Sequence, residues 1–379
     1  MGKKRNRYVF VVGGDHNNTL AVVRSLGVAG YCPIPVIVSE QRKSFVAASR
    51  YVRTFRIVFR DDDLVDCLRE LHAELRLFGE KPKVICCSDG AAVIVDASPW
   101  VRAHFSVPGV GGKSAGKLSR LMGKEEMTRL AEMSGFLIPK TFLVSKKGNE
   151  NIPDCPEALT FPCIIKPDKS FLGSKHDFRI CKDLGEWNSA WDRLPAEMNF
   201  LVQPFLENVR DGQLLGVRLR DGRCVLGGSV EKPICCPETH NLGMAIIADF
   251  LPDAERFVRR SVVESFLGKT GYVGPFSIEF LISGNSVYFV EINFRTDGNF
   301  YLSLAGGVNL PEIWCDDVGS EEFRAKPVRG IVEISYLKYI ALKKPFRIIY
   351  DFLKADTFAI FSLRDPLPFF AKLFSKIIL

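Results

Sequence analysis

The chain has 379 residues, of which 47% are hydrophobic and 25% charged, and its formal net charge is +7. These proportions are typical of globular proteins, so extensive disorder, a collagen helix and a coiled-coil rod are excluded. No run of about 18 consecutive apolar residues occurs, which argues against a conventional membrane-spanning helix. From Arg324 to Leu379, 11 Lys and Arg stand against 4 Asp and Glu, an excess equal to the whole-chain charge. Because the basic excess is confined to this segment, we expect no nucleic acid partner.

The cysteines and the N-terminal segment indicate a cellular compartment. Eleven cysteines occur without any Cys-x-x-Cys spacing. The apolar run after the basic N-terminus, Tyr8–Gly14, is too short for the core of a signal peptide. We therefore expect reduced thiols and a cytoplasmic protein.

Residues 1–110 alternate short apolar runs with segments of helical spacing. Strands are expected at Tyr8–Val12, Pro35–Val38, Arg56–Phe59 and Lys83–Cys87. Helices are expected at Thr19–Val28, Leu64–Phe78 and Gly90–Ala97. Strand and helix in alternation predict a parallel sheet with helices on both faces. Gly13-Gly14-Asp15 lacks the full G-x-G-x-x-G pattern, so we expect a tight turn there and no dinucleotide site.

Beyond residue 110 the pattern changes from alternation to a series of strands. Val107–Gly116 is typical of a connection, and Leu118–Met133 predicts one helix. The later elements expected are strands at Phe161–Lys166, Phe178–Cys181, Phe200–Phe205, Leu214–Leu219, Arg223–Val230, Pro275–Ile282 and Ser286–Asn293, with a helix at Ala254–Leu267. We predict an N-terminal α/β domain at 1–110, a second domain at 111–320 with lobes at about 140–205 and 206–320, and a basic extension at 321–379.

The stretch 275–299 carries the most specific chemical signal. Two apolar strands are joined by the turn Ser283-Gly284-Asn285, and they carry Glu279 and Glu291. Side chains alternate along a strand, so Glu291 and Asn293 share one face and Glu279 can approach across the hairpin. A carboxylate among apolar neighbours is costly unless it is paired or metal-bound. Oxygen donors in this arrangement predict Mg²⁺ bound to nucleotide phosphates, with a solvated strand face as the alternative.

Several other side chains fit a phosphate ligand. Arg295 extends the face of Asn293, although a surface salt bridge is the alternative. Lys166 ends an apolar strand and precedes a loop of small polar residues. A lysine before such a loop suits phosphate neutralisation under a closing lid. Further on, the strand Phe200–Phe205 leads into a connection where Gln203 can meet a flat heterocycle and Asp211 a ribose.

In their order, these features resemble the ATP-grasp superfamily over roughly residues 5–320. Within it the chain is similar to the carboxylate–amine ligases, of which D-aspartate ligase is an example. The residues that carry the likeness are Lys124, Lys166, the loop 168–175, the hinge after Phe200, Glu279, Glu291-x-Asn293-x-Arg295, Leu121–Glu125, Pro139–Thr141 and Asn299–Tyr301. The resemblance implies an α/β protein with an N-terminal Rossmann-like (pre-ATP-grasp) domain followed by a two-lobed α+β ATP-grasp domain.

The resemblance also implies roles for individual residues. The ATP-binding set that it implies is Lys124, Lys166, Ser170, Gly173, Ser174, Lys175, Gln203, Leu206 and Asp211. The implied ligands of two Mg²⁺ ions, for which Mn²⁺ can substitute, are Glu279, Glu291 and Asn293. Arg295 and Lys232 would face the reacting groups. The chain departs from the family pattern at Phe294, where a proline is common, at Pro204, where the hinge often carries an acid, and in a lid with one glycine.

The reaction that the resemblance implies joins a small-molecule carboxylate to an amine. ATP phosphorylates the carboxylate, and the amine then displaces phosphate from the acyl phosphate, so that an amide, ADP and phosphate are formed. The alternatives are another ATP-grasp reaction, by carboxylation or phosphoryl transfer, and a non-catalytic nucleotide-binding protein on the same fold. An amino acid or a cell-envelope precursor is a candidate substrate, and a homodimer is a candidate assembly because related ligases are often dimers; the sequence leaves both open.

The C-terminal segment 366–379 predicts a basic amphipathic helix. Phe370, Leu373 and Phe374 recur at helical spacing, with Lys372 on another side. Two interpretations stay open. The apolar face either packs on the enzyme or a second subunit, or makes weak peripheral contact with the inner face of a membrane.

Overall fold

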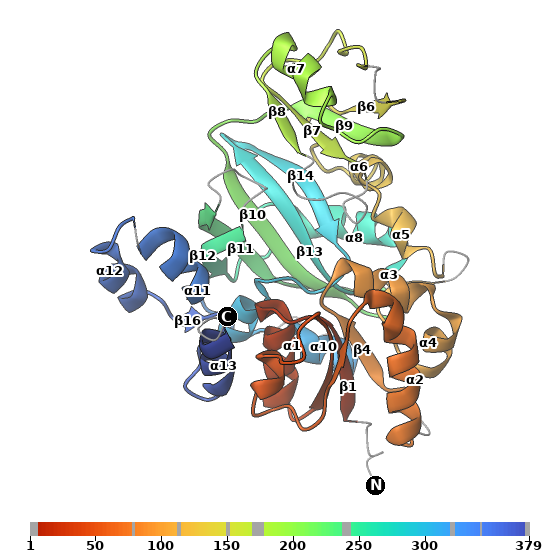
Figure 1. The fold of residues 1–379 in the computed structure, drawn as a ribbon, viewed down its shortest axis with the longest axis vertical. Coiled ribbons are helices and arrows are strands. Elements are labelled where there is room, and N and C mark those ends of the chain that lie inside the picture. Colours follow the sequence, from red (N-terminus) through yellow and green to blue (C-terminus); the bar gives the residue numbers. More distant parts are fainter. Residues whose placement is uncertain are drawn as a thin grey trace.

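The computed structural model describes residues 7–77, 80–111, 115–148, 152–168, 178–236, 244–318, 323–341 and 343–375. These residues form three sheets, two of them four-stranded and one larger. The large sheet occupies the middle of the molecule, the N-terminal sheet lies below it and a small sheet stands above it (Figure 1). The predicted α/β class is therefore confirmed.

The N-terminal sheet is parallel, with the strand order β3-β2-β1-β4. Its strands are β1 (Tyr8–Gly14), β2 (Cys32–Val38), β3 (Arg56–Val58) and β4 (Lys83–Cys86). Its helices are α1 (Asn17–Val28), α2 (Leu64–Glu74), α3 (Asp89–Ala97) and α4 (Pro99–His104), with 3-10 turns at Val46–Ala48 and Asp61–Asp63. Because side chains alternate along β1, Phe10 joins the core formed with α2 and α3, whereas Val11 joins the core formed with α1.

The large sheet has the order β14-β13-β10-β11-β12-β15-β16. Its strands are β10 (Arg210–Arg218), β11 (Cys224–Cys236), β12 (Met244–Leu251), β13 (Tyr272–Ser283), β14 (Ser286–Asn293), β15 (Val328–Ile331) and β16 (Thr357–Phe358), and β5 (Gly109–Val110) pairs with the start of β13. The associated helices are α8 (Arg260–Thr270), α9 (Phe300–Ala305) and α10 (Leu310–Asp316). On one face of the β13–β14 hairpin, Ile278, Phe280 and Ile292 are buried in a core that includes Phe266 of α8. The residues between them therefore face the other way.

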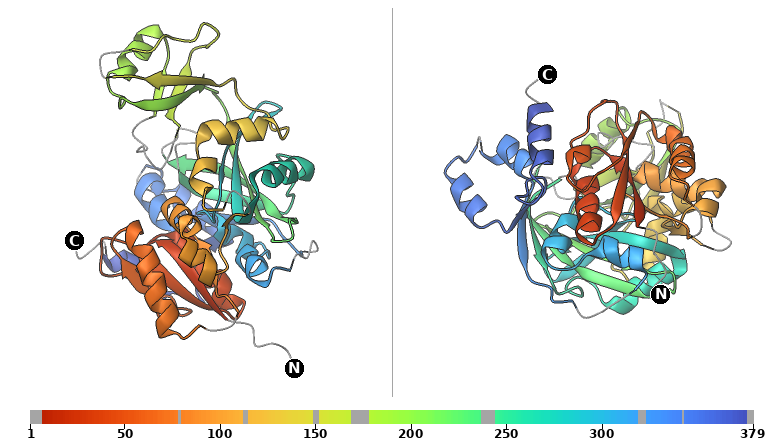
Figure 2. Two further views of the ribbon diagram at one scale, coloured as in Figure 1. Left: turned by 90° about the vertical axis from the view of Figure 1, so that its right-hand side faces the viewer. Right: turned by 90° about the horizontal axis from the view of Figure 1, so that it is seen from below.

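The small sheet is antiparallel, with the order β6-β9-β7-β8. Its elements are β6 (Phe142–Lys146), β7 (Cys163–Pro167), β8 (Arg179–Cys181), β9 (Met198–Pro204) and α7 (Leu184–Trp191). Trp187 and Trp191 of α7 are fully buried against it. The sheet has a core of its own and stands at one end of the molecule (Figure 2).

Several elements differ from the sequence-based expectation. The helix expected over Leu118–Met133 is broken into α5 (Leu118–Leu121) and α6 (Lys124–Glu132). The backbone N–H groups that open α6 donate to Asp168, whose carbonyl and carboxylate oxygens lie 2.9 and 2.8 Å away. A distant residue thus starts a new helix inside a periodic segment. Helix α8 begins at Arg260 and not at Ala254, because the Glu255 carboxylate accepts the Arg260 N–H. Strand β12 was not expected.

The segment after residue 320 is built into the large sheet rather than only appended to it. Strand β15 pairs with β12, and β16 pairs with β15. The helices here are α11 (Glu333–Tyr336), a π turn (Leu337–Ala341), α12 (Arg347–Leu353) and α13 (Leu367–Ser375). Asp365 anchors α13 to the N-terminal part, accepting from Arg24 Nε at 2.9 Å and Ser49 Oγ at 2.8 Å.

Across the part of the chain that the structure describes, none of the helices combines the length and the hydropathy needed to span a bilayer.

Candidate functional site

The two glutamates of the β13–β14 hairpin lie directly opposite each other. The short turn pairs Ser283 with Ser286, and a β-bulge beyond the Phe280–Phe289 pair then shifts the register by one residue, so that Glu279 faces Glu291 and Ser277 faces Asn293. Both carboxylates lie on the face of the hairpin opposite to the Ile278 core. Directly opposed residues on antiparallel strands have Cβ atoms about 5 Å apart, so the two acids share one small volume.

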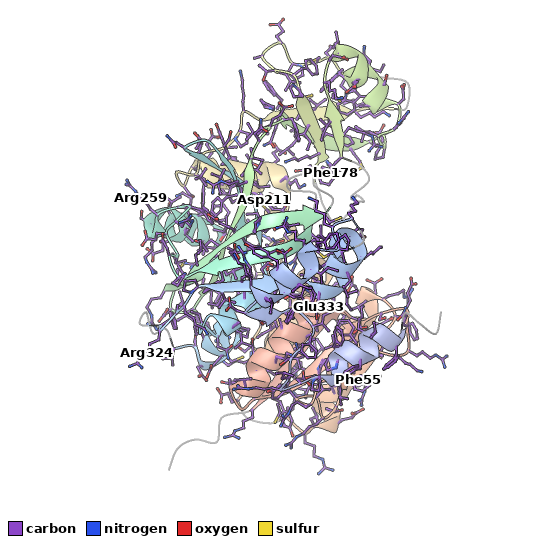
Figure 3. All side chains as sticks on the ribbon, turned by 90° about the vertical axis from the view of Figure 1, so that its left-hand side faces the viewer. Phe55, Phe178, Asp211, Arg259, Arg324 and Glu333 are labelled. Carbon is purple, nitrogen blue, oxygen red and sulfur yellow. The ribbon has the colours of Figure 1, made fainter. Side chains whose placement is uncertain are left out.

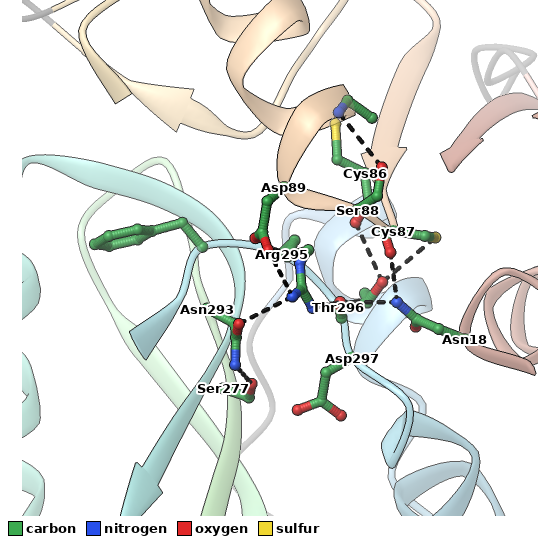
Figure 4. Close-up of polar contacts among 12 residues, drawn as sticks. Asn18, Cys86, Cys87, Ser88, Asp89, Ser277, Asn293, Arg295, Thr296 and Asp297 are labelled. Carbon is green, nitrogen blue, oxygen red and sulfur yellow. Dashed lines mark hydrogen bonds and ion pairs between the residues drawn. The ribbon is translucent and has the colours of Figure 1, made fainter. Parts of the chain in front are cut away.

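Asn293 and Arg295 continue this face toward the N-terminal sheet (Figure 4). Asn293 Nδ2 donates to Ser277 Oγ at 3.2 Å, which leaves the amide oxygen to accept from an Arg295 Nη at 3.0 Å. Arg295 also donates two hydrogen bonds to the Asp89 carboxylate, from Nε to Oδ1 at 2.7 Å and from Nη2 to Oδ2 at 3.0 Å. Burial lowers the pKa of Arg295, but the Asp89 carboxylate, together with Asp297 and Glu291, raises it above its ordinary value.

Two lysines face the glutamate pair from the small sheet and from α6. Lys124 opens α6 and its Nζ lies 5.0 Å from the centre of the Phe178 ring. Lys166, on β7, has its Nζ 3.4 Å from Gln203 Oε1. Burial and the positive charge of Lys124 lower the pKa of Lys166 to about 8. Both lysines thus lie within electrostatic range of Glu291.

Burial and the neighbouring charges determine how readily Glu291 ionises. Burial raises the pKa of its carboxyl group, and the negative charges of Glu279 and Asp89 add to that effect, while Lys124 and Lys166 oppose it. The carboxylate of Glu291 therefore interacts electrostatically with both lysines and with both neighbouring acids. Its charge is incompletely compensated in the protein alone, and a cation would compensate it.

Lys232 of β11 forms a second charged group on the other side of Glu279. Its Nζ lies 3.5 Å from Glu279 Oε2. Burial lowers its pKa, but Glu279, Asp297 and Asp211 together raise the pKa above its ordinary value. Asp211, expected at a ribose, is buried beside this lysine, with Oδ2 3.9 Å from Cys235 Sγ. In Figure 3, Asp211 and Phe178 lie where the small sheet faces the large one.

The hinge residues lie at the border between these two sheets. Gln203 Nε2 donates to Thr141 Oγ1 at 2.8 Å, so its amide bridges Thr141 and Lys166. Leu206 is half-buried just beyond β9. The lid residues expected from the sequence, namely Ser170, Gly173, Ser174 and Lys175, lie outside the described residues. Among the described residues of the expected site, hydrogen bonds or electrostatic interactions connect Lys124, Lys166, Gln203, Asp211, Lys232, Glu279, Glu291, Asn293 and Arg295, whereas Leu206 is placed only by its position just beyond β9.

Phe294, which departs from the family pattern, points away from the site. Its side chain is buried, with its ring centroid 4.8 Å from that of Tyr272. The Tyr272 hydroxyl donates to the Phe294 carbonyl at 2.8 Å. The aromatic side chain thus packs into the core and leaves the hydrogen bond between Asn293 and Arg295 intact.

Sequence reasoning missed a set of polar residues behind Arg295. Gln213 donates to the Asp297 carboxylate and accepts from Asn299 Nδ2 at 2.7 Å. Asn18, at the start of α1, donates to the carbonyls of Cys87 and Thr296, both at 2.9 Å. Asp89 was also missed. Its place at the carboxyl end of β4, where parallel sheets bind ligands, was the signal available in the sequence.

The donor set fits Mg²⁺ better than a transition metal. Within the described ranges, three or more His, Cys, Asp or Glu nowhere gather as ligands of one ion. Glu279 and Glu291 with the Asn293 amide offer only hard oxygen donors, and Mg²⁺ takes few protein ligands when phosphates complete its shell. Glu291, with its raised pKa, is the ligand whose charge such an ion would balance.

Comparisons with known proteins agree with this geometry. No family model matches the chain. The carbamoyl phosphate synthase large chain of Saccharolobus islandicus is 23% identical over 203 residues, which are 52% of this chain and 19% of that protein. The chain thus spans about a fifth of the length of this curated relative.

Solved structures match over most of the chain. N5-carboxyaminoimidazole synthetase from Staphylococcus aureus, also solved with ADP, has a TM-score of 0.66 at 13% identity and covers 89% of this chain and 86% of its own. L-amino acid ligase from Bacillus licheniformis has a TM-score of 0.64 at 13% identity and covers 86% of this chain and 80% of its own. With the expected acids, amide and lysines along one border of sheets, these likenesses show that the chain has the ATP-grasp fold.

Proposed function

We propose that the protein is an ATP- and Mg²⁺-dependent carboxylate–amine ligase that forms an amide bond through an acyl phosphate. The observation that carries the proposal is the opposed pair Glu279 and Glu291, with Asn293 beside it and two lysines facing it. Carboxylates for a divalent cation and lysines for phosphate are what a bound nucleoside triphosphate requires. The L-amino acid ligase neighbour supports an amine as the acceptor.

The residues take the following roles in this proposal. Mg²⁺ held by the two glutamates and Asn293 would neutralise charge on the phosphates. Lys124 and Lys166 hold the phosphate oxygens from the opposite side, and Arg295 stabilises the acyl phosphate. Gln203 and Leu206 border the adenine, Asp211 the ribose, and Ser170, Gly173, Ser174 and Lys175 form the lid.

Bond formation then needs positioning more than a nucleophilic side chain. The substrate carboxylate attacks the γ-phosphorus, ADP leaves, and the amine attacks the resulting acyl phosphate with loss of inorganic phosphate. Lys232, held charged by Glu279, faces the acceptor side. Arg295 keeps its orientation because Asp89 binds it at two points. Water must be excluded while the acyl phosphate exists, which is the task of a lid.

The test is an ADP-release screen with the full chain, ATP, Mg²⁺ and pairs of amino acids. We expect ADP release that requires both a carboxylate and an amine, with the amide identified by mass spectrometry. With hydroxylamine in place of the amine, the same carboxylate should yield a hydroxamate. ADP release with bicarbonate alone would point to carboxylation. Nucleotide binding without turnover on any carboxylate would point to a binding protein.

A further inference from the structure

The C-terminal helices expose large apolar side chains to an unusual degree. In α12 and the residue before it, Phe346 is 96% exposed, Leu353 81% and Ile349 71%. Single exposed apolar residues are common on soluble proteins, but neighbouring ones that point the same way mark an interaction site. Positions 346, 349 and 353 are three and four residues apart, so they form one stripe along the helix.

Helix α12 is apolar on two sides. Its inner side packs Ile348 and Phe352 into a core with Tyr336. Its outer side carries the stripe of Phe346, Ile349 and Leu353. A helix that is apolar all round is normally buried on all sides or lies against lipid. Within the described residues, no other element covers the outer stripe, since its three side chains are largely exposed.

The charge around this stripe is positive. Residues 343–354 contain four Lys or Arg and one Asp. That acid, Asp351, is buried and accepts from Arg347 at 2.8 Å and from the Tyr336 hydroxyl at 2.7 Å. Lys343 and Lys344 precede the stripe and Lys354 follows it, all of them exposed. The outer side of α12 therefore combines apolar side chains with lysines at both ends.

Helix α13, which like α12 lies in the left half of Figure 1, adds further exposed apolar side chains. Its inner side is anchored, with Phe369 packed against the core and Lys372 Nζ 4.3 Å from the centre of the Phe45 ring. Leu367, Phe370 and Phe374 remain exposed. The apolar side chains that the sequence pattern placed on one face of this helix, Phe370, Leu373 and Phe374, are thus exposed.

We propose that the outer stripe of α12, with its flanking lysines, docks the protein on an anionic lipid surface. Phe346, Ile349 and Leu353 would insert at the level of the headgroups, and Lys343, Lys344 and Lys354 would meet lipid phosphates. Aromatic and aliphatic side chains bordered by lysines form the combination that holds helices in the plane of a membrane interface. The proposal is independent of the ligase reaction, since α12 lies outside the site.

A second copy of the chain fits this stripe less well. A two-fold contact through α12 would bring the lysines that flank the stripe in one copy close to those of the other copy, and like charges repel. Lysine is also depleted from the centres of protein interfaces. A seven-residue helix exposes far less than the roughly 800 Å² that each partner of a stable interface buries.

Vesicle co-sedimentation of the full chain tests the proposal. Vesicles of phosphatidylcholine with about 30% phosphatidylglycerol should pellet the protein, and vesicles of phosphatidylcholine alone should not. Replacing the stripe, Ile349→Ser with Leu353→Ser, should weaken binding by about tenfold or more. Replacing two charges, Lys343→Gln with Lys344→Gln, should weaken it by roughly thirtyfold at low salt. The matched control is Leu143→Ser with Leu184→Ser, which changes two half-exposed leucines of the small sheet.

The outcomes distinguish a lipid surface from a second copy of the chain as the partner of the stripe. Binding that needs anionic lipid, falls with salt and is lost only in the α12 variants supports the proposal. Three results would overturn it. These are no sedimentation of the wild type, equal loss in the control variant, and a dimer in light scattering that the stripe variant converts to a monomer. Melting temperatures of all variants show whether the stripe variant still folds, and the charge variant, which changes exposed lysines only, gives the same answer independently.

Discussion

Replacing Glu291 by Gln should affect the ligand-free fold and the bound state in opposite directions. In the protein alone, burial and the neighbouring acids raise the pKa of this carboxyl group, so its charge destabilises the fold at neutral pH. Gln has the same shape without the charge, so the ligand-free variant should be more stable than the wild type.

The size of the effect follows from the length of the chain. Unfolding entropy is about 2.1 cal/mol/K per residue, or about 0.8 kcal/mol/K for 379 residues. Each kcal/mol of added stability thus raises the melting temperature by roughly 1 °C, and the ligand-free variant should melt above the wild type. A non-hydrolysable ATP analogue with Mg²⁺ at 100 times its Kd contributes about 2.7 kcal/mol, or about 3 °C, in the wild type. The variant should lose most of this second shift.

The assay is a thermal melt of the wild type, Glu291→Gln and Glu264→Gln, each with and without Mg²⁺ and the analogue. Glu264 is a solvent-exposed acid on α8, so its variant should match the wild type in both respects. The stability difference between wild type and Glu291→Gln should grow as the pH rises and vanish as the pH falls below about 4.5, where the carboxyl group is protonated even when unfolded. A ligand-free variant less stable than the wild type, or a nucleotide shift that survives the substitution, would refute this reasoning.

Three further predictions concern the lysine, the arginine and the C-terminal anchor. Because Lys166 has a pKa of about 8 and phosphates favour its charged form, nucleotide affinity should fall as the pH rises through 8. Calorimetry in two buffers should detect proton uptake on nucleotide binding. The variant Lys166→Arg, which stays charged, should remove this pH dependence. In Arg295→Lys the side chain cannot form both hydrogen bonds to the Asp89 carboxylate, so ADP release should fall about a hundredfold. The nucleotide-induced shift in melting temperature should persist. Loss of both the activity and the shift would mean that Arg295 is needed to bind nucleotide. Asp365→Ala leaves Arg24 buried without its partner, which should cost about 3–5 kcal/mol and lower the melting temperature by about 4–6 °C; an unchanged melt would show that the anchor does not stabilise the fold.

The hairpin at the centre of the site could be predicted from the sequence because its geometry is local. Apolar residues at every second position predicted β13 and β14, and strand alternation placed Glu291 and Asn293 on one face. The two-residue turn alone would pair Glu279 with Val290, and a β-bulge after the Phe280–Phe289 pair shifts the register by one residue and sets Glu279 opposite Glu291. The parallel N-terminal sheet is equally local, since each strand–helix unit repeats the same pattern.

Elements that depend on distant partners could not be predicted in this way. The break before α6 exists because Asp168 accepts its first N–H groups, and a helical period carries no sign of that residue. Strand β15 was not expected because its pairing with β12 joins segments about 80 residues apart. The pairing of Arg295 with Asp89 spans 206 positions.

The sequence by itself therefore determined the chemistry of the site, because strand alternation places donor side chains on a face without reference to the rest of the chain. Only the tertiary structure decided what surrounds those donors. It brought Asp89 to Arg295 and Lys232 to Glu279, and it turned one side of α12 outward while burying the other. The physical reason is that burial and charge depend on which segments pack together, and these set the pKa values of Lys166 and Glu291.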